Sequence, residues 1–359
     1  MASDSKCVDV EAWGRKPGVY LYTLRNGGIT ARITNWGATI VSLCLRDPSA
    51  GEDIDIVLGF DSCDPYMDGT SPYFGCIVGR VANRIKDASF SMDGVTYTLP
   101  ANNNMNTLHG GEVGYDKVLW QSQIVKESQV PVVEFTYHSS DGEQGFPGEL
   151  DVSVTYALHE NELRVEMRAV PASKQTPVSL AQHTYWNLAG HKSGSILDHT
   201  ICISASRYTP VDDFQIPTGE LAPVAGTAFD FLQEARIGSR IDQVEGGYDH
   251  NYVLDQKQGP GLCFAARVRD PSSGRTMELL TDAPGLQFYT GNFLVAEAGK
   301  DGEVYRKHAG LCLETQGFPN AVNDARFPSV MVSPGEVYRH QMVFRFSVTQ
   351  KEKTKCLLE

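Results

Sequence analysis

Apolar and polar residues alternate with a period of two along much of this chain of 359 residues. Every second residue from 150 to 158 is apolar, and the alternation returns from 163 to 169 after the turn-like segment HENE. A second pair of such runs, within residues 89–99, is separated by Asp93-Gly94, a dipeptide favoured in tight hairpin turns. Because side chains on a strand point alternately to its two faces, these segments are predicted to form antiparallel hairpins with one buried face.

Helical periodicity is weak by comparison, and we find no convincing amphipathic helix longer than about three turns. The 34 glycines and 18 prolines interrupt the sequence at short intervals. Many short strands between turns are typical of β-sandwiches and barrels. No linker or internal repeat divides the sequence. The predicted fold class is therefore all-β, a single large antiparallel β-sandwich whose long loops carry the function.

Charge narrows the classes of function. The chain has 31 Lys and Arg against 44 Asp and Glu, a net charge of −13. Such a surface repels phosphate backbones and anionic lipids, so neither a nucleic-acid partner nor a membrane partner is expected. No run of about 18 apolar residues could span a bilayer. The first residues lack the apolar core of a secretory signal, so a cytoplasmic location is expected.

The eight cysteines fit a reducing compartment. None forms a C-x-x-C pair, and most stand in apolar runs, such as those around Cys76 and Cys312. They are predicted to be small buried hydrophobes rather than disulfide or zinc positions. Cys356, in the terminal KCLLE, stands where a prenylated cysteine would, but Glu359 matches that signal poorly. Residues 349–359 are therefore expected to form a polar C-terminal tail.

The segment QHTYWNLAG, residues 182–190, concentrates side chains that bind sugars. Aromatic rings pack on the apolar faces of sugars, whereas amides and imidazoles hydrogen-bond hydroxyl groups. His183 adds the one side chain whose ordinary pKa lies close to neutral pH. We interpret the segment as the wall of a polar small-molecule pocket that contains a proton-transfer group. Taken alone, it leaves a hydrogen-bonded structural histidine as the alternative.

Five further segments place polar residues beside glycine, and Glu314 is the strongest candidate among them for a catalytic residue. It directly follows the apolar run of residues 310–313, which is predicted to be a buried strand. Partial desolvation there would raise the pKa of the carboxyl group toward a useful base strength. The alternative is a structural salt bridge with Arg84. The other candidates in these segments are Asn83, Arg84, His109, Asp249, Gln287, Asn292 and Gln316.

Sequence templates for other chemistries do not occur. The chain has no G-x-S-x-G nucleophile elbow, no H-E-x-x-H, no phosphate-binding loop and no G-x-G-x-x-G after a strand. No group of His, Cys, Asp or Glu has recognised metal-ligand spacing. We therefore expect neither a metal nor a cofactor. The remaining polar residues suit a polyhydroxylated ligand and proton transfer.

The polar segments also resemble, as a set and in order, the motifs of the aldose 1-epimerase (galactose mutarotase) family. The resemblance implies a large antiparallel β-sandwich with a carbohydrate-binding cleft, the galactose mutarotase-like supersandwich. It covers residues 19–348 as an aldose 1-epimerase domain, and residues 1–18 are expected to be an N-terminal extension. The matching blocks are GRVANRI, LHGG with GYDKVLW, QHTYWNLAG, YDHNYVL, GLQFYTGN and HAGLCLETQGFPNAVN.

The resemblance implies a role for each matching residue. His183 matches the general acid of the family and Glu314 its general base, and Tyr185 is expected to line the site. The expected reaction interconverts the α- and β-anomers of a free aldohexose, such as glucose or galactose, by ring opening and reclosure. Sugar-binding roles are implied for Asn83, Arg84, His109, Asp249 and Gln287.

Three alternatives remain open from the sequence. A hexose-6-phosphate mutarotase of the same fold would need further cationic residues at the cleft, where the motifs offer mainly Arg84. An isomerase of a non-sugar hemiacetal could use the same acid–base pair. A non-catalytic sugar-binding protein would usually lack the acid or the base, and both are present here. The sequence does not distinguish the preferred aldose, and a monomer is expected by default.

Overall fold

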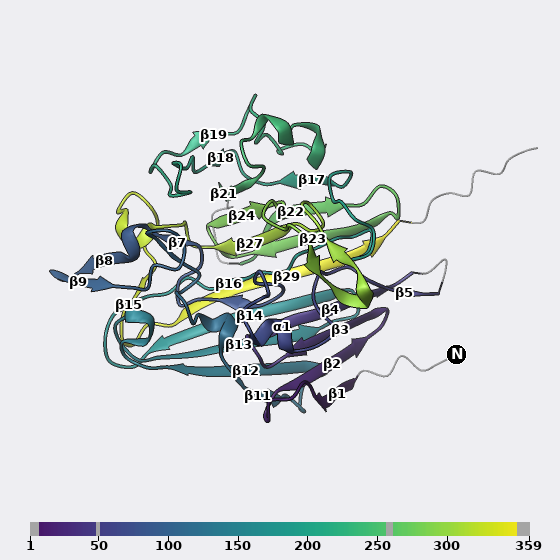
Figure 1. The fold of residues 1–359 in the computed structure, drawn as a ribbon, viewed down its shortest axis with the longest axis horizontal. Coiled ribbons are helices and arrows are strands. Elements are labelled where there is room, and N and C mark those ends of the chain that lie inside the picture. The colour runs from purple at the N-terminus through teal and green to yellow at the C-terminus, as the bar shows by residue number, and fades with distance from the viewer. Residues whose placement is uncertain (1–6, 48–50, 256–260, 350–359) are drawn as a thin grey trace, which may run out of the picture.

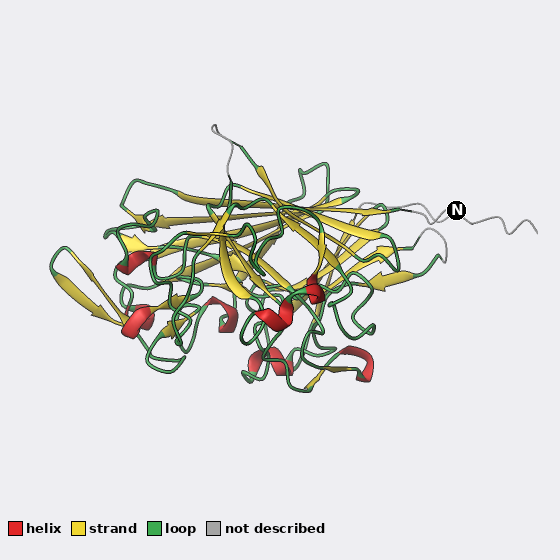
Figure 2. Cartoon of the chain, turned by 90° about the horizontal axis from the view of Figure 1, so that it is seen from above, coloured by secondary structure: helices red, strands yellow, loops and turns green. Residues whose placement is uncertain are grey.

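The chain is built almost entirely of β-structure. The computed structural model describes residues 7–47, 51–255 and 261–349. Within these ranges the one α-helix, α1 (Asp64–Met67), has four residues. Figure 2 shows the strands in layers, with the short helical turns gathered on one side of them. The prediction of an all-β fold with large antiparallel sheets is confirmed.

The largest sheet has nine strands and extends across the molecule in Figure 1. The hairpin predicted for residues 150–169 lies in this sheet, and Leu158 pairs with Leu163 beside its turn. In strand order, the sheet contains β11 (Gln121–Ile124), β12 (Val132–Ser139), β13 (Leu150–Leu158), β14 (Glu162–Pro171), β29 (Tyr338–Val348), β23 (Arg275–Thr281), β22 (Cys263–Arg269), β17 (Thr200–Ile203) and β20 (Ala235–Arg236).

The second predicted hairpin is also present. Strands β8 (Ser89–Met92) and β9 (Val95–Thr98) pair through Met92 and Val95. Asp93 and Gly94 between them have φ values of 52° and 77°. A two-residue type I′ turn requires a positive φ at both positions, which is why this dipeptide was informative in the sequence.

Two five-stranded sheets complete the main layers. The N-terminal sheet contains, in order, β1 (Cys7–Ala12), β2 (Tyr20–Asn26), β3 (Ile29–Thr34), β4 (Thr39–Arg46) and β5 (Asp53–Asp55). Part of the expected N-terminal extension therefore pairs with β2 as an edge strand. The other sheet, which we call the site sheet, contains β19 (Ala222–Pro223), β18 (Arg207–Tyr208), β21 (Asp249–Val253), β24 (Gly285–Tyr289) and β27 (Cys312–Gln316).

Short elements connect these sheets. The two-stranded pairs are β6 (Ile77–Val78) with β16 (Ala181–Gln182), β7 (Arg84–Ile85) with β10 (Thr107–Leu108), β15 (Thr176–Pro177) with β28 (Met331–Val332), and β25 (Glu297–Ala298) with β26 (Val304–Tyr305). The 3₁₀ turns are η1 (Lys86–Ala88), η2 (Tyr115–Lys117), η3 (Glu143–Gly145), η4 (Ile237–Ser239), η5 (Ile241–Gln243), η6 (Lys300–Gly302) and η7 (Ala321–Asn323).

No helix in the described ranges has the length and apolar character needed to cross a membrane. Cys356 and the KCLLE segment lie outside the described residues.

The site sheet has one apolar and one polar face. Leu286, Phe288 and Leu313 are buried in the main hydrophobic core. Because successive side chains alternate between the faces of a strand, their neighbours Gln287 and Glu314 project from the opposite face. Strand alternation therefore places a buried row of polar groups on the outer side of the core.

Candidate active site

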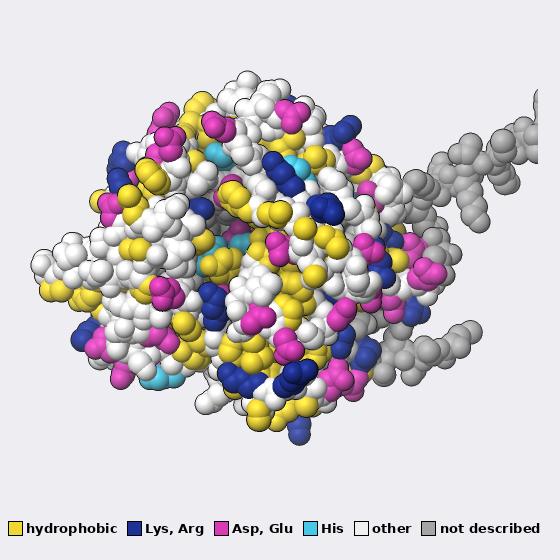
Figure 3. Space-filling model, in the orientation of Figure 1, with side chains coloured by type: hydrophobic (Ala, Val, Ile, Leu, Met, Phe, Trp, Pro, Cys, Tyr) yellow, Lys and Arg dark blue, Asp and Glu magenta, His cyan; other side chains and the backbone are white. Residues whose placement is uncertain are grey.

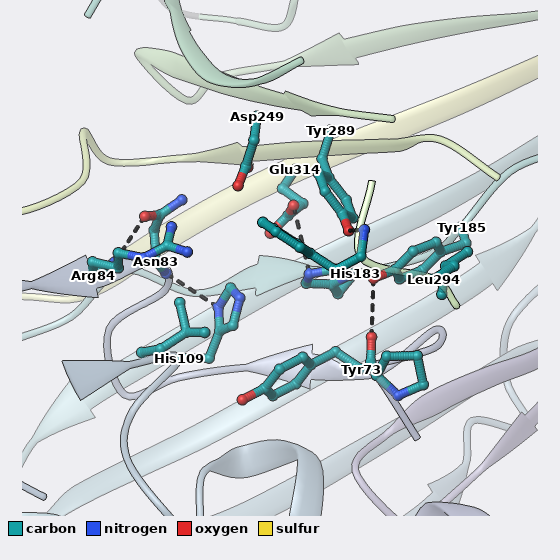
Figure 4. A pocket seen from close by; sticks show the side chains of 13 residues that line it. Tyr73, Asn83, Arg84, His109, His183, Tyr185, Asp249, Tyr289, Leu294 and Glu314 are labelled. Atoms are coloured by element: carbon teal, nitrogen blue, oxygen red, sulfur yellow. Dashed lines mark hydrogen bonds and ion pairs between the residues drawn. The ribbon is translucent and has the colours of Figure 1, made fainter. Parts of the chain in front are cut away.

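An open pocket of about 170 Å³ lies at the polar face of the site sheet. Figure 3 shows a hollow near the centre of the molecular face, with histidine side chains visible inside it. Seven of the eight residues that the sequence predicted for the site line this pocket (Figure 4): Asn83, Arg84, His109, His183, Tyr185, Asp249 and Glu314.

Gln287, the eighth predicted residue, is not part of the lining. It pairs directly with Glu314 across β24 and β27. Its Nε2 donates a hydrogen bond of 2.7 Å to Asp249 Oδ1. Gln287 therefore contacts the pocket through a lining carboxylate. The further candidate Asn292 is outside the lining as well, and its Nδ2 donates to the backbone oxygen of Tyr248.

His183 is held by the extended segment that includes β16. Its backbone N–H donates to Cys76 O. Three residues further on, Trp186 pairs with Val57 and Leu311 and packs its ring on Phe344, with ring centroids 5.0 Å apart. Anchoring Trp186 in the core leaves His183 and Tyr185 to line the pocket, where their rings stack at 5.2 Å.

The sequence left a structural role open for both His183 and Glu314, but the structure brings the two together. His183 Nε2 lies 3.6 Å from Glu314 Oε1, and both side chains are almost fully buried. Arg84, the salt-bridge partner considered for Glu314, instead donates from Nε to Asn103 Oδ1 at 3.0 Å. No Arg84–Glu314 ion pair is present among the described residues.

Burial shifts the ionisation of this pair in opposite directions. It lowers the pKa of His183 to about 4. It raises the pKa of Glu314 well above its usual range, and the negative charge of Asp249 adds to the rise, while Arg84 opposes it. Desolvation disfavours the charged form of each group. Perturbed pairs of this kind, in a pocket, are typical of acid–base sites.

His109 faces the pair from the LHGG segment. Its Nδ1 accepts a hydrogen bond of 3.2 Å from the backbone N–H of Asn83. A neutral imidazole that accepts at Nδ1 carries its proton on Nε2, so His109 can donate to a ligand oxygen. The following Gly110 has φ +93°, and a Cβ there would lie 1.9 Å from Gly79 O. Glycine at this position therefore allows the two backbone segments to approach closely.

Three lining residues have left-handed backbone conformations. Tyr73, Asn83 and His109 have φ values of 66°, 60° and 52°. Non-glycine residues seldom adopt this region, and such positions cluster at functional sites. Three of the thirteen non-glycine residues with a positive φ in the described ranges thus line this one pocket, which agrees with a binding role for it.

A metal ion is the main alternative to direct proton transfer. Ligand atoms of His109, His183 and Glu314 all lie within 4.8 Å of one another, so these three residues could bind a metal ion. The hydrogen bond from Asn83 N–H disfavours this, because the proton on His109 Nε2 would occupy the ligating lone pair. The expectation of a metal-free site therefore stays a prediction with a structural argument behind it.

Sequence reasoning did not identify six lining residues: Pro72, Tyr73, Leu108, Tyr289, Phe293 and Leu294. Tyr73 contacts both histidines, with ring centroids 4.7 Å from His109 and 5.6 Å from His183. Its SPYFG segment had no polar cluster that would draw attention. Tyr289 lies within the GLQFYTGN motif, and Phe293, which is 66% exposed, directly follows it. Their position in or beside this polar motif was the one sequence feature that could have identified them as lining residues.

A histidine–carboxylate pair at the polar face of a β-sandwich, walled by aromatic rings and hydrogen-bonding groups, defines a class of carbohydrate-active acid–base enzyme. The aldose 1-epimerase family model matches residues 20–345. The chain belongs to the aldose 1-epimerase family, which confirms the resemblance read from the motifs and the assignment to the isomerases.

Individual relatives agree with this membership. The chain is 47% identical to the galactose mutarotase of Rattus norvegicus over 329 residues, covering 91% of this chain and 94% of the relative. It is 38% identical to the aldose 1-epimerase of Escherichia coli K12, with the same coverage of both chains. The crystal structure of a GalM/aldose epimerase homologue from C. elegans superimposes with a TM-score of 0.83 at 29% identity, covering 96% of this chain and all of that one.

Proposed function

We propose that this chain interconverts the α- and β-anomers of free aldohexoses, galactose and glucose among them. The observation that carries the proposal is the 3.6 Å approach of His183 Nε2 to Glu314 Oε1 inside a pocket lined by hydrogen-bonding groups. Membership of the aldose 1-epimerase family supports the reaction, and the galactose mutarotases among the relatives support galactose as a substrate.

The reaction needs one proton acceptor and one proton donor. Glu314, as a carboxylate, takes the proton from the anomeric hydroxyl while His183, as an imidazolium, delivers one to the ring oxygen. The C1–O5 bond breaks and an open-chain aldehyde forms. Rotation about C1–C2 presents the other carbonyl face to the C5 hydroxyl, and reclosure runs both proton transfers in reverse. The two residues end in their starting states.

The catalytic pair must hold one proton between its two members. Burial favours neutral His183 and protonated Glu314, whereas the proposed roles require the proton on His183. Both arrangements contain the same number of protons. A sugar hydroxyl that donates to Glu314 stabilises its ionised form and so favours transfer of the proton to His183.

The remaining lining groups fit the orientation of a sugar. His109 Nε2–H and the guanidinium of Arg84 are donors that can stabilise the oxygen on which charge develops. Asp249, held by Gln287, and Asn83 are suited to the other hydroxyl groups. The rings of Tyr73 and Tyr185 offer apolar faces to the ring carbons.

The pocket favours a free sugar over a sugar phosphate. Arg84 is the single Lys or Arg among the lining residues in the described ranges. A phosphate group is usually bound by several cationic or backbone donors.

A cytoplasmic location and a monomeric state belong to the same proposal. The seven cysteines in the described part of the chain are all free, as a reducing compartment would require.

Polarimetry of freshly dissolved sugars tests the proposal. α-D-galactose and α-D-glucose should equilibrate faster with the enzyme, and glucose 6-phosphate should be a poorer substrate. Glu314→Gln and His183→Asn should each lose about 10²-fold or more of the rate, whereas His138→Asn, at an exposed histidine, should not.

Other outcomes would support the alternatives. A preference for glucose 6-phosphate would indicate a sugar-phosphate mutarotase. Tight galactose binding without turnover would indicate a sugar-binding protein, and inactivity on all common aldoses would indicate another hemiacetal. A folded Glu314→Gln variant with the wild-type rate would contradict the acid–base assignment.

A further inference from the structure

Four buried polar side chains meet on the site sheet next to the sugar pocket. Asn251 on β21 pairs directly with Gln287 on β24, which in turn pairs with Glu314 on β27. Gln316 follows two residues later on β27, so it projects from the same face as Glu314. Directly opposed side chains of antiparallel strands have Cβ atoms about 4.5–5.5 Å apart. All four residues are at most 3% exposed.

Gly285 has no side chain at the point where these residues meet. It lies opposite Gln316 in the β24–β27 register, two residues before Gln287. A Cβ on Gly285 would lie only 2.5 Å from Asn251 Oδ1. The side chain of Asn251 therefore leans over Gly285, where any larger residue would displace it. We call the region between the side chains of Asn251, Gln287, Glu314 and Gln316 the Gly285 chamber.

The chamber gathers polar atoms that bind no other protein group. Within the described part of the chain, six such atoms have no hydrogen-bond partner: Asn251 Nδ2 and Oδ1, Gln287 Oε1, Glu314 Oε2, and Gln316 Nε2 and Oε1. Buried polar groups in native proteins are nearly always satisfied, and ordered water is the usual partner where protein groups are missing. The set mixes amide donors with oxygen acceptors. Water can satisfy both kinds, whereas a cation would satisfy the oxygens alone.

We propose that ordered water occupies the Gly285 chamber and donates a hydrogen bond to Glu314 Oε2, with Asn251 and Gln316 holding the water in place. This inference rests on the proposed role of Glu314. Oε1 faces His183, so the water would fix the second oxygen and thereby the plane of the carboxylate. Neither Asn251 nor Gln316 lines the sugar pocket. They are positioning residues, which act on the base through water.

A second cavity lies beside Gln316, one of the residues that bound the chamber. Gln316 lines a cavity of about 150 Å³, together with Ser179, Tyr338 and His340. None of these four residues lines the sugar pocket. Gln316 therefore stands between the chamber and a cavity that is separate from the sugar pocket.

A matched pair of substitutions tests the positioning role. The side chains of valine and threonine have nearly the same shape, but only Asn251→Thr supplies a hydroxyl group that can bind water. Asn251→Val should lower kcat/KM for galactose about tenfold with KM little changed, since it removes a hydrogen bond to the base. Its alkaline pH limb should move to higher pH, because the ionised carboxylate loses a donor. Asn251→Thr should restore part of both effects, and Gln316→Met should behave as Asn251→Val does.

A high-resolution crystal structure of the wild-type chain tests the water directly and needs no variant. We expect a water within hydrogen-bond distance of Glu314 Oε2 and of Asn251 or Gln316. A dry chamber, or a cation with oxygen contacts of about 2.3–2.6 Å, would overturn the proposal. So would a folded Asn251→Val enzyme with the wild-type rate and pH profile. Failure of the acid–base proposal is separate, since it is measured by Glu314→Gln.

Discussion

Cys312 Sγ lies 3.7 Å from His183 Nδ1, on the side of the imidazole away from Glu314. Cys312 and Glu314 stand two residues apart on β27, so one strand contacts both nitrogens of the histidine. Burial holds the pKa of the Cys312 thiol well above its usual range, which keeps it protonated. A thiol can donate weakly to a neutral imidazole and accept weakly from an imidazolium. It therefore suits both states of a histidine that gives and takes a proton.

Replacing this thiol should slow catalysis without weakening sugar binding. Cys312→Ala removes the Nδ1 contact and leaves the ring less firmly oriented, so kcat should fall about fivefold while KM stays unchanged. Polarimetric progress curves over a range of galactose concentrations give both constants. Cys202→Ala, at a half-buried cysteine outside the pocket lining, is the control and should keep wild-type kinetics. A rise in KM alone in Cys312→Ala would contradict an orienting role.

The pH profile should report the single proton on the catalytic pair. In the wild type, kcat/KM should fall at low pH, when the pair gains a second proton, and at high pH, when it loses its only one. Asp249 raises the pKa of Glu314, because a neighbouring anion disfavours ionisation. Asp249→Asn removes that charge, so the pKa of Glu314 should fall and the alkaline limb should move to lower pH.

Asp249→Asn should also raise KM about tenfold, through the lost hydrogen bond to a sugar hydroxyl. The rate measured in a series of buffers from acid to alkaline pH separates the two effects. Asp213→Asn, at an exposed carboxylate, should change neither quantity. An alkaline limb that stays in place in Asp249→Asn would show that Glu314 does not set it.

Local patterns predicted the elements of this site better than its three-dimensional details. The period of two located the strands, and it explains why His183 and Tyr185 reach the pocket while Trp186 enters the core. The approach of His183 to Glu314 joins residues 131 positions apart (314 minus 183), so the chain pattern alone left their roles open. The family motifs supplied that pairing.

Sequence patterns could not locate contacts made by loops. Tyr73 reaches both histidines because its backbone takes a left-handed turn, with φ 66°, and no motif marks this. Gln287 stands in a strong motif, yet strand register directs its amide to Asp249 behind the lining. Backbone conformation and strand register decided these positions, and both depend on tertiary structure.

Chelation should leave the reaction unaffected. The proton on His109 Nε2, set by the hydrogen bond from Asn83 N–H, opposes metal binding by the trio of His109, His183 and Glu314. Prolonged dialysis of the full chain against EDTA should therefore preserve the rate of galactose anomerisation. Metal analysis of the dialysed protein confirms that chelation was complete. Loss of activity that added Zn²⁺ restores would indicate that the trio is a metal site.

The close approach at Gly110 should make this glycine irreplaceable. Gly110→Ala would put a Cβ 1.9 Å from Gly79 O at a φ of +93°, and both the clash and the backbone strain destabilise the fold. Gly94→Ala is the matched control, because Gly94 also has a positive φ but open space around the added methyl. We expect Gly94→Ala to cost about 1 kcal/mol of unfolding free energy and Gly110→Ala at least about 3 kcal/mol. Urea unfolding followed by tryptophan fluorescence measures both. Because His109 precedes Gly110, the Gly110→Ala enzyme should also lose most of its activity at temperatures where it remains folded, and equal costs in the two variants would contradict the close contact.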